Sequence, residues 1–288
     1  MLSEAARVAS PLSRSVFHPS DFSKASENAF AHALAIALRG RGKFTILHAM
    51  AEDFSDRSWS LFPGVRKTLE RWGVIEEGSP RSAVAEELGI KVRKINSRGK
   101  DPLAASLAYV EKSDTDLMVL STERRQGLPR WIRPSLAERL ARRASTRSLF
   151  VPKGANGFVS ADSGEFTLRR ILVPVDHGPD PAVAAEAAEK AAGLADGEAV
   201  EVQLLHVGDA DERPRVDPPP GSAYRWSEAQ RSGEVVPQIV EAAESFDADL
   251  IVMATAGHDG LLDALRGSMT EQVLRCAPCA LLSVPAAT

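Results

Sequence analysis

Short apolar runs alternate with longer amphipathic stretches along most of the chain. In its second part, three stretches have helical spacing and length: Ala182–Leu194, Glu234–Phe246 and Ser268–Cys276. Four shorter, mainly apolar runs are typical of buried strands. These runs are Ile171–Val175, Val200–Val207, Asp249–Ala254 and Ala280–Val284. Strands that alternate with helices in this way predict an α/β fold, a parallel sheet covered by helices on both faces.

The chain contains an internal repeat. Arg14–Asp21 (RSVFHPSD) corresponds to Arg169–Asp176 (RRILVPVD), and Asp114–Pro152 corresponds to Asp247–Pro285 at a constant offset of 133 residues. A period this long indicates two copies of one domain, not a solenoid of short repeats. The length of 288 residues agrees with two domains of ordinary size.

We place the two copies at residues 1–155 and 165–288. The segment Lys153–Leu168 is rich in Gly, Ser and Asp and lacks periodicity, as expected of a boundary between domains. The first copy has an additional helical segment, Gly64–Leu88, where the second copy has Pro218–Gly221 (PPPG). Because proline is incompatible with a helix interior, we expect the second copy to lack this second helix.

Composition and charge narrow the classes of function. Hydrophobic residues make up 44% and charged residues 26% of the chain, which is the balance of a folded globular protein. The net charge of -4 argues against nucleic acid as a partner. The charge is unevenly distributed, however, with +9 in residues 1–155 and -13 in residues 156–288. Opposite charges on tethered domains favour their docking against each other.

The sequence also predicts where the protein is found. No apolar run approaches the ~18 residues that span a bilayer, so we expect no membrane partner. Met1–Ser10 lacks the apolar core of a signal peptide. Two cysteines cannot form a disulfide scaffold. We therefore expect a cytoplasmic protein.

Two serines at equivalent positions have a structural interpretation. Ser135 and Ser268 each begin a helical stretch, and each is followed three residues later by a glutamate, Glu138 or Glu271. This spacing is typical of a capping box, in which the serine satisfies free N–H groups of the helix. A contact from Ser268 to a phosphate is compatible with this role.

Other candidate chemistry is weak. His48 and His206 recur at one repeat position near a strand end, which favours an architectural role. Cys276 and Cys279 form a C-x-x-C pair at the end of a helix, where the thiolate is not stabilised. The sequence has no P-loop, no G-x-G-x-x-G and no metal-ligand spacing. We assign no catalytic and no metal-binding residue, and expect a weak ATPase at most.

The second copy carries ILVPVD from Ile171, LLHV from Leu204, DLIVMATAGHDG from Asp249 and LRGSMTEQVLRCAPCALLSVP from Leu265. These segments resemble the universal stress protein family, and the chain resembles a tandem member of it. The resemblance implies a five-stranded, mostly parallel sheet in each domain, of the adenine nucleotide alpha hydrolase-like type. It further implies a stress-response role as a regulatory or ligand-binding protein.

Some members of that family bind ATP, so the resemblance implies a ligand that is ATP or another adenine nucleotide, with Mg²⁺ as an accompanying ion. Glycines let a backbone approach phosphates closely, and a helix N-terminus favours anions. The family's nucleotide contacts, carried over residue by residue together with their neighbours, fall on Pro174, Val175, Asp176, Val207, Gly257, Gly260, Gly267, Ser268 and Met269.

The glycine loop of the second copy departs from the family pattern. Six residues, Leu261–Arg266, separate Gly260 from Gly267, where the family's ATP binders have nine. A loop that is three residues shorter has roughly 10 Å less extended reach. The alternative therefore stays open that the protein is an interaction module that binds no nucleotide and acts through protein partners.

The loop of the first copy is more strongly altered. The equivalents Asp21, Gly127 and Ser135 remain, but Arg124 and Pro134 stand where the second copy has glycines. Neither residue has the conformational freedom of glycine, and proline has no N–H to donate. We expect any nucleotide site in the second copy.

Single-domain members of the family commonly dimerise through their last strands. By this resemblance, Ser148–Pro152 and Leu281–Pro285 are expected to pair edge to edge within the chain and to form an internal pseudo-dimer. Such pairing would cover both exposed edges. The sequence leaves open a homodimer of the whole chain and the identity of protein partners.

Overall fold

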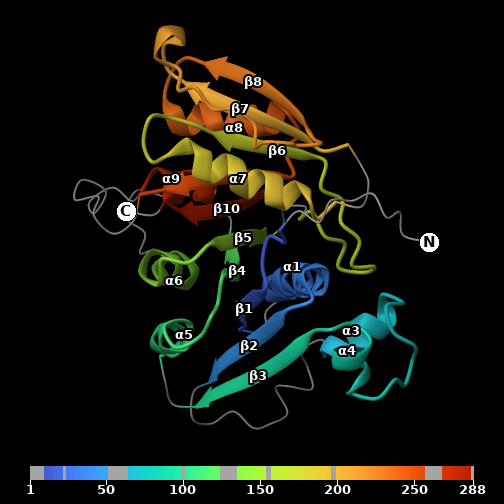
Figure 1. The fold of residues 1–288 in the computed structure, drawn as a ribbon. Helices are drawn as coiled ribbons and strands as arrows, with labels where there is room; N and C mark the ends of the chain where they lie inside the picture. Colours follow the sequence, from blue (N-terminus) through green and yellow to red (C-terminus); the bar gives the residue numbers. More distant parts are fainter. Residues whose placement is uncertain are drawn as a thin grey trace.

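The computed structural model of the protein describes residues 10–21, 24–50, 64–98, 101–123, 135–153, 157–195, 199–256 and 268–286. Its centre is one ten-stranded sheet in the order β3-β2-β1-β4-β5-β10-β9-β6-β7-β8 (Figure 1). The first half supplies β1 (Ser15–Pro19), β2 (Lys43–Met50), β3 (Lys91–Arg98), β4 (Leu117–Glu123) and β5 (Ser148–Lys153). The second half supplies β6 (Arg170–Pro174), β7 (Glu201–Val207), β8 (Arg225–Arg231), β9 (Leu250–Thr255) and β10 (Ala280–Pro285).

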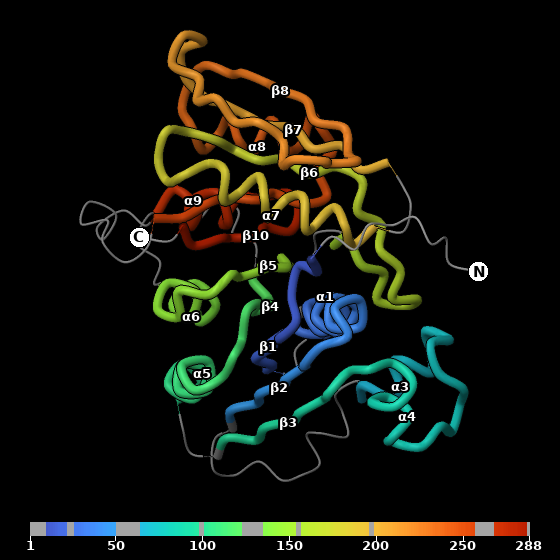
Figure 2. The backbone as a smooth tube through the Cα atoms, in the orientation of Figure 1, coloured from blue at the N-terminus to red at the C-terminus, as the bar shows by residue number. Residues whose placement is uncertain are grey.

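The two halves have the same strand order and meet at their last strands. All neighbouring strands are parallel except β5 and β10, which are antiparallel. Leu149 lies opposite Leu282, and Phe150 lies opposite Leu281. This pairing, called the seam below, confirms the prediction that the two last strands pair within the chain. Figure 2 shows the two halves on either side of the seam.

Helices cover both faces of the sheet. One face carries α1 (Lys24–Gly40), α3 (Val65–Arg71), α4 (Ala83–Glu86) and α7 (Pro181–Ala192). The other face carries α5 (Pro102–Val110), α6 (Leu136–Ala144), α8 (Val235–Ser245) and α9 (Met269–Cys276). None of the helices in the described ranges has the length and apolar character needed to cross a membrane.

The apolar runs follow from this layered arrangement. Successive side chains of a strand point to opposite faces, so a strand covered on both faces is apolar at most of its positions. Both cores continue across the seam, since Leu149 and Leu282 belong to one and Phe150 and Leu281 to the other.

The four strands and three helices predicted for the second half are confirmed, with ends that differ by at most two residues. The strand β8 is not among them, since its sequence RWSEAQR has no apolar run. The helical segment predicted at Gly64–Leu88 consists of two short helices instead of one. It holds α3 and α4, and Gly73 and Gly78 between them have positive φ angles of 68° and 82° that end the helical path. The corresponding residues 208–224 of the second half hold a 3₁₀ turn, η1 (Ala210–Glu212), and no α-helix.

Part of the predicted boundary segment packs against the hydrophobic core. Residues 157–168 form a small hairpin, with a bridge between Val159 and Phe166. We call this segment the strap. Phe158 and Leu168 of the strap are buried in the core that includes α1, and the Phe158 ring meets His32 of α1 edge to face at 4.8 Å. The division at residues 155 and 165 stays a prediction.

Candidate functional site

The strand order of the second half defines a crevice at one edge of the sheet. The chain passes from β6 outward to β7 and β8, and then crosses back to β9 and β10 on the other side of β6. The ladder between β6 and β9 ends at Leu172 and Ile251, so the carboxyl ends of these strands do not pair with each other. In parallel α/β sheets, ligands bind outside the carboxyl ends of the strands at such a reversal of strand order.

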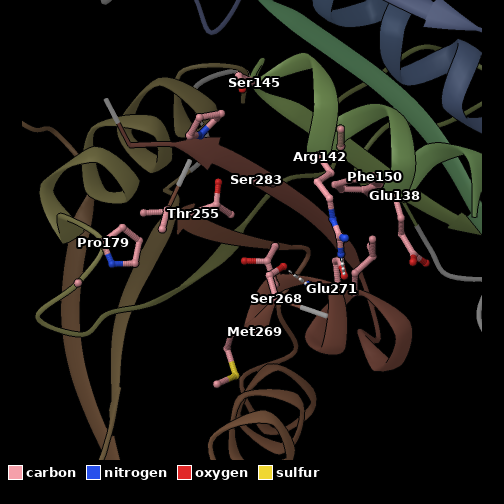
Figure 3. Close-up of a pocket in the computed structure, with 17 residues that line it drawn as sticks. Glu138, Arg142, Ser145, Phe150, Pro179, Thr255, Ser268, Met269, Glu271 and Ser283 are labelled. Carbon is pink, nitrogen blue, oxygen red and sulfur yellow. Dashed lines mark hydrogen bonds and ion pairs between the residues drawn. The ribbon is translucent and has the colours of Figure 1, made fainter. Parts of the chain in front are cut away.

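An open pocket of about 630 Å³ lies at this edge of the sheet (Figure 3). The second half supplies Thr255 at the end of β9, Ser268 and Met269 at the start of α9, and Pro179 between β6 and α7. The first half supplies residues of α6 and of β5, among them Arg142. The volume suits a ligand of nucleotide size. The pocket therefore belongs to both halves and lies across the seam.

The start of α9 has the predicted serine cap. Ser268 has extended backbone angles, and its Oγ accepts a hydrogen bond from the Glu271 N–H at 3.2 Å. Ser135 caps α6 in the same way, with 3.1 Å between its Oγ and the nitrogen of Glu138. The first N–H groups of an α-helix have no acceptor inside the helix and attract anions. The first turn of α9 forms part of the pocket wall.

The glutamates of the two predicted capping boxes have a different role from the one expected. In a capping box the glutamate bonds back to the backbone N–H of the cap residue. Here Glu271 accepts from Nη2 of Arg142 at 2.5 and 2.6 Å and from Nε at 2.9 Å. Glu138 accepts from Nη2 of Arg275 at 3.1 Å. Both pairs join α6 to α9, so the predicted box is half correct: the serine caps, and the glutamate ties the halves together.

The residues predicted at the base of the site lie at the ends of β6 and β7. Val175 is buried and Pro174 and Val207 are half-buried, whereas Asp176 is exposed. Asp176 accepts a hydrogen bond from the backbone N–H of His177 at 2.8 Å through Oδ1. Among the predicted contacts that the structure describes, Ser268 and Met269 line the pocket. Gly127, Gly257, Gly260 and Gly267 lie outside the described residues.

The recurring histidines hold the second strand of each half to the end of the first. His48 donates from Nδ1 to the carbonyl oxygen of Ser20 at 2.6 Å. His206 donates in the same way to the carbonyl oxygen of Val175 at 3.3 Å. Both histidines are buried. A carbonyl oxygen can only accept, so Nδ1 carries the proton in both rings. This supports the architectural role predicted for them.

The first half has a buried polar cluster at the end of its first strand. His18 of β1 occupies the position of Val173 in the repeat, and its Nδ1 donates to the Val119 carbonyl of β4 at 2.9 Å. Its Nε2 lies 3.3 Å from the Ser26 hydroxyl, which lies 2.8 Å from that of Ser20. Burial lowers the pKa of His18 to about 4, so the ring is neutral at pH 7.

This buried cluster was not predicted from the sequence. The signal for it was a histidine in RSVFHPSD at the position where the other copy, RRILVPVD, has a valine. The other equivalents that the structure describes in the first half lie as their counterparts do in the second: Asp21 is exposed just beyond the end of β1, and Ser135 caps α6.

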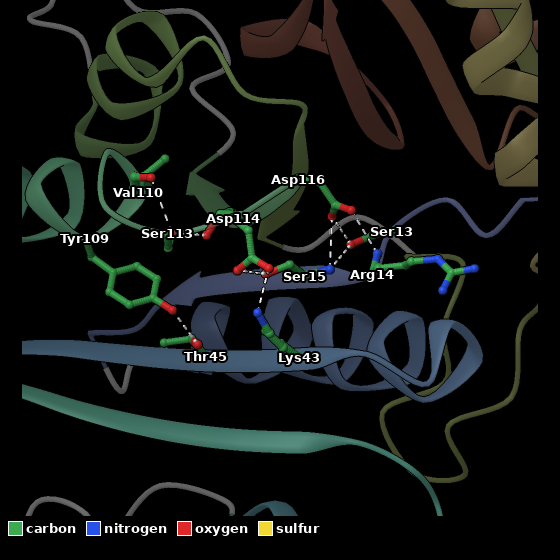
Figure 4. A network of polar contacts seen from close by, with 11 residues as sticks. Ser13, Arg14, Ser15, Lys43, Thr45, Tyr109, Val110, Ser113, Asp114 and Asp116 are labelled. Atoms are coloured by element: carbon green, nitrogen blue, oxygen red, sulfur yellow. Dashed lines mark hydrogen bonds and ion pairs between the residues drawn. The ribbon is translucent and has the colours of Figure 1, made fainter.

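Acidic residues that recur at the opposite, amino edge of the sheet have a structural role (Figure 4). Asp116 accepts hydrogen bonds from the Arg14 N–H at 2.9 Å and the Ser15 N–H at 3.1 Å. Its repeat equivalent Asp249 accepts from the N–H groups of Arg169 and Arg170 at 2.7 and 2.9 Å. These carboxylates fix the entry into the first strand of each half.

Neighbouring charges at this edge are paired as well. Lys43 lies 2.6 Å from Asp114, and the hydrogen bond from this lysine lowers the pKa of the Asp114 carboxyl. Within the described residues, no group of three His, Cys, Asp or Glu side chains is placed to hold a metal ion. Cys276 is exposed, Cys279 is buried, and neither forms a disulfide.

The chain is similar to proteins of one family. The model of the Universal stress protein family matches residues 14–152 and 225–285. A universal stress protein of Methanocaldococcus jannaschii is 36% identical over 149 residues, covering 42% of this chain and 85% of that protein.

Two solved structures are similar over both halves. A universal stress protein from Archaeoglobus fulgidus has a TM-score of 0.62 at 16% identity, covering 96% of this chain and 98% of that one. A protein of unknown function from Pseudomonas aeruginosa has a TM-score of 0.59 at 17% identity, covering 95% and 93%. At 16% and 17% identity, this similarity shows a shared fold.

Proposed function

Because the chain belongs to the universal stress protein family, we propose that it is a regulatory, ligand-binding protein of the stress response whose second half binds an adenine nucleotide. The observation that carries the proposal is the pocket at the carboxyl ends of the strands, with the capped start of α9 in its wall. In this proposal the phosphates lie against the first turn of α9 and the loop that contains Gly257, Gly260 and Gly267.

The base of the proposed site is formed by the ends of β6 and β7. In this proposal the base consists of Pro174, Val175 and Asp176, at and just beyond the end of β6, and of Val207 at the end of β7. Asp176 is exposed and so is accessible to a ribose hydroxyl. The proposal includes Mg²⁺ only as an ion carried by the phosphates.

The two halves are proposed to differ in function. In the first half, His18, Ser20 and Ser26 form a buried hydrogen-bonded cluster at the end of β1. The same strand position in the second half is occupied by Val173, which makes no such cluster. We therefore assign the first half a supporting role and the second half the ligand.

Two further parts of the proposal concern assembly and location. Because β5 and β10 pair with each other, the edges by which single domains would dimerise are used within the chain, and a homodimer would need another surface. We propose a reducing, cytoplasmic location, because two cysteines are too few for the disulfide scaffold of a small secreted protein.

The first experiment is mass spectrometry of a denatured extract of the purified protein, which should contain an adenine nucleotide. A thermal-shift titration with ATP follows, since a ligand at 100 times its dissociation constant adds about 2.7 kcal/mol of stability. Asp176→Ala should weaken the shift, and the matched variant Asp21→Ala in the first half should not. No shift at millimolar ATP would favour the alternative, an interaction module that binds no nucleotide.

A further inference from the structure

One ion pair in the pocket wall has a partner from each half. Arg142 of α6 and Glu271 of α9 both line the pocket, and their three hydrogen bonds of 2.5 to 2.9 Å are drawn in Figure 3. The Arg142 side chain is 45% exposed, whereas that of Glu271 is 11% exposed. The guanidinium is therefore the partner that a ligand in the pocket can reach.

We infer that Arg142 binds a phosphate of the ligand in exchange for Glu271, so that the first half completes the site of the second. This inference rests on the proposed nucleotide site. A phosphate at the start of α9 would lie close to Glu271, the third residue of that helix, and the two negative charges would repel each other. The planar fork of arginine matches phosphate as well as carboxylate, so the exchange keeps the cation paired.

The released glutamate has a second partner within its own helix. Ser268 and Glu271 have the spacing of a capping box, and in that motif the glutamate accepts from the backbone N–H of the serine. Glu271 thus has two favourable arrangements, one across the seam to Arg142 and one within α9. Binding would shift it from the first to the second and would remove one of the two ion pairs that join α6 to α9.

The repeat supplies a matched control. Arg275 is the repeat equivalent of Arg142, and its pair with Glu138 also joins the two helices. Arg275 does not line the pocket, although Arg142 does. Removal of either arginine breaks one ion pair between the halves, but only removal of Arg142 takes a cation from the site.

The test is isothermal titration calorimetry of the full chain with ATP and with adenosine. Arg142→Gln should weaken ATP binding about tenfold or more, in line with loss of a charge-assisted hydrogen bond, while Arg275→Gln should change it less than about twofold. Adenosine carries no phosphate, so Arg142→Gln should leave its affinity within about twofold. Glu271→Gln should tighten ATP binding, because it frees the guanidinium and removes the repulsion; this variant tests the inference even if loss of Arg142 impairs folding.

The possible outcomes separate the inference from the proposed function. If the wild type binds ATP and both arginine variants bind it equally well, the inference is wrong and the nucleotide site stands. Weaker ATP binding by Glu271→Gln would also overturn it. If the folded wild type binds neither ATP nor adenosine, the proposed function fails and the inference fails with it.

Discussion

His18 Nδ1 donates to the carbonyl oxygen of Val119 at 2.9 Å, one residue beyond the last paired positions of β1 and β4, Phe17 and Met118. A side chain thus continues the contact between two strands whose backbones no longer pair. The ring is fully buried, and its burial sets both its charge and a dependence of stability on pH.

The free energy of unfolding should fall as the pH is lowered from about 6.5 to about 4. Burial lowers the pKa of His18 and of His32 from 6.5 to about 4, so in this range the unfolded chain binds protons that the folded chain does not. The contribution of the two histidines to the free energy of unfolding is fully present above pH 6.5. Near pH 4, about 3 kcal/mol of it is lost for each histidine. Urea denaturation at pH 7.5, 6 and 5 measures this fall.

His18→Val places at this position the residue of the other copy. In this variant the free energy of unfolding should decrease less as the pH is lowered from about 6.5 to about 4. At pH 7.5 the variant should be about 1 to 3 kcal/mol less stable, because the Val119 carbonyl and the Ser26 hydroxyl lose a partner. An unchanged slope between pH 7.5 and 5 in the variant would mean that His18 is not the group that takes up the proton.

A second prediction concerns the strap. A Cβ on Gly157 would overlap the ring of His32, which is buried in α1 against Phe158. Gly157→Ala should therefore cost about 1 to 3 kcal/mol, as overpacking of a core does. Gly64→Ala is the control, since nothing lies near the added carbon there, and its effect should stay within about 0.5 kcal/mol. Equal stability of the two variants in chemical denaturation would show that the strap is not packed as described.

The features that were predictable from the sequence are those that repeat. The matching roles of His48 and His206 follow from two copies of one domain, because the two residues occupy the same place in each copy. The seam between β5 and β10 was predictable from the resemblance to a family whose single-domain members dimerise through their last strands. The four buried strands of the second half were predictable because strands covered on both faces are mainly apolar.

The features that were missed depend on contacts between distant residues or on exposure. The edge strand β8 has one uncovered side and a polar sequence, so it has no apolar run. Nothing in the order of residues shows that Arg142 reaches Glu271, 129 positions away in the other half. The strap lacks periodicity because a few anchors, Phe158 and Leu168 among them, hold it to the core.

A third prediction concerns the seam. Leu149 and Leu282 face each other across β5 and β10 and are buried to 1% and 0% exposure. Leu282→Ala should lower the free energy of unfolding by about 2 to 5 kcal/mol, through lost burial and the cavity left behind. Leu136→Ala makes the same chemical change at a side chain that is 40% exposed, and should cost less than about 1 kcal/mol. Similar losses for the two variants in urea denaturation would contradict a buried seam.

The fourth prediction concerns the other ion pair between α6 and α9, in which Glu138 lines the pocket and Arg275 does not. Arg275→Gln leaves the carboxylate of Glu138, whose side chain is 7% exposed, without its cation, and should cost about 2 kcal/mol. Adding Glu138→Gln should recover at least half of that loss, because a neutral amide needs no counter-charge. Arg213→Gln, which breaks a pair whose glutamate is 50% exposed, should change the stability by less than about 1 kcal/mol. Chemical denaturation of the three variants at one pH and salt concentration measures these differences. If the double variant is less stable than Arg275→Gln alone, Glu138 contributes through contacts other than its charge.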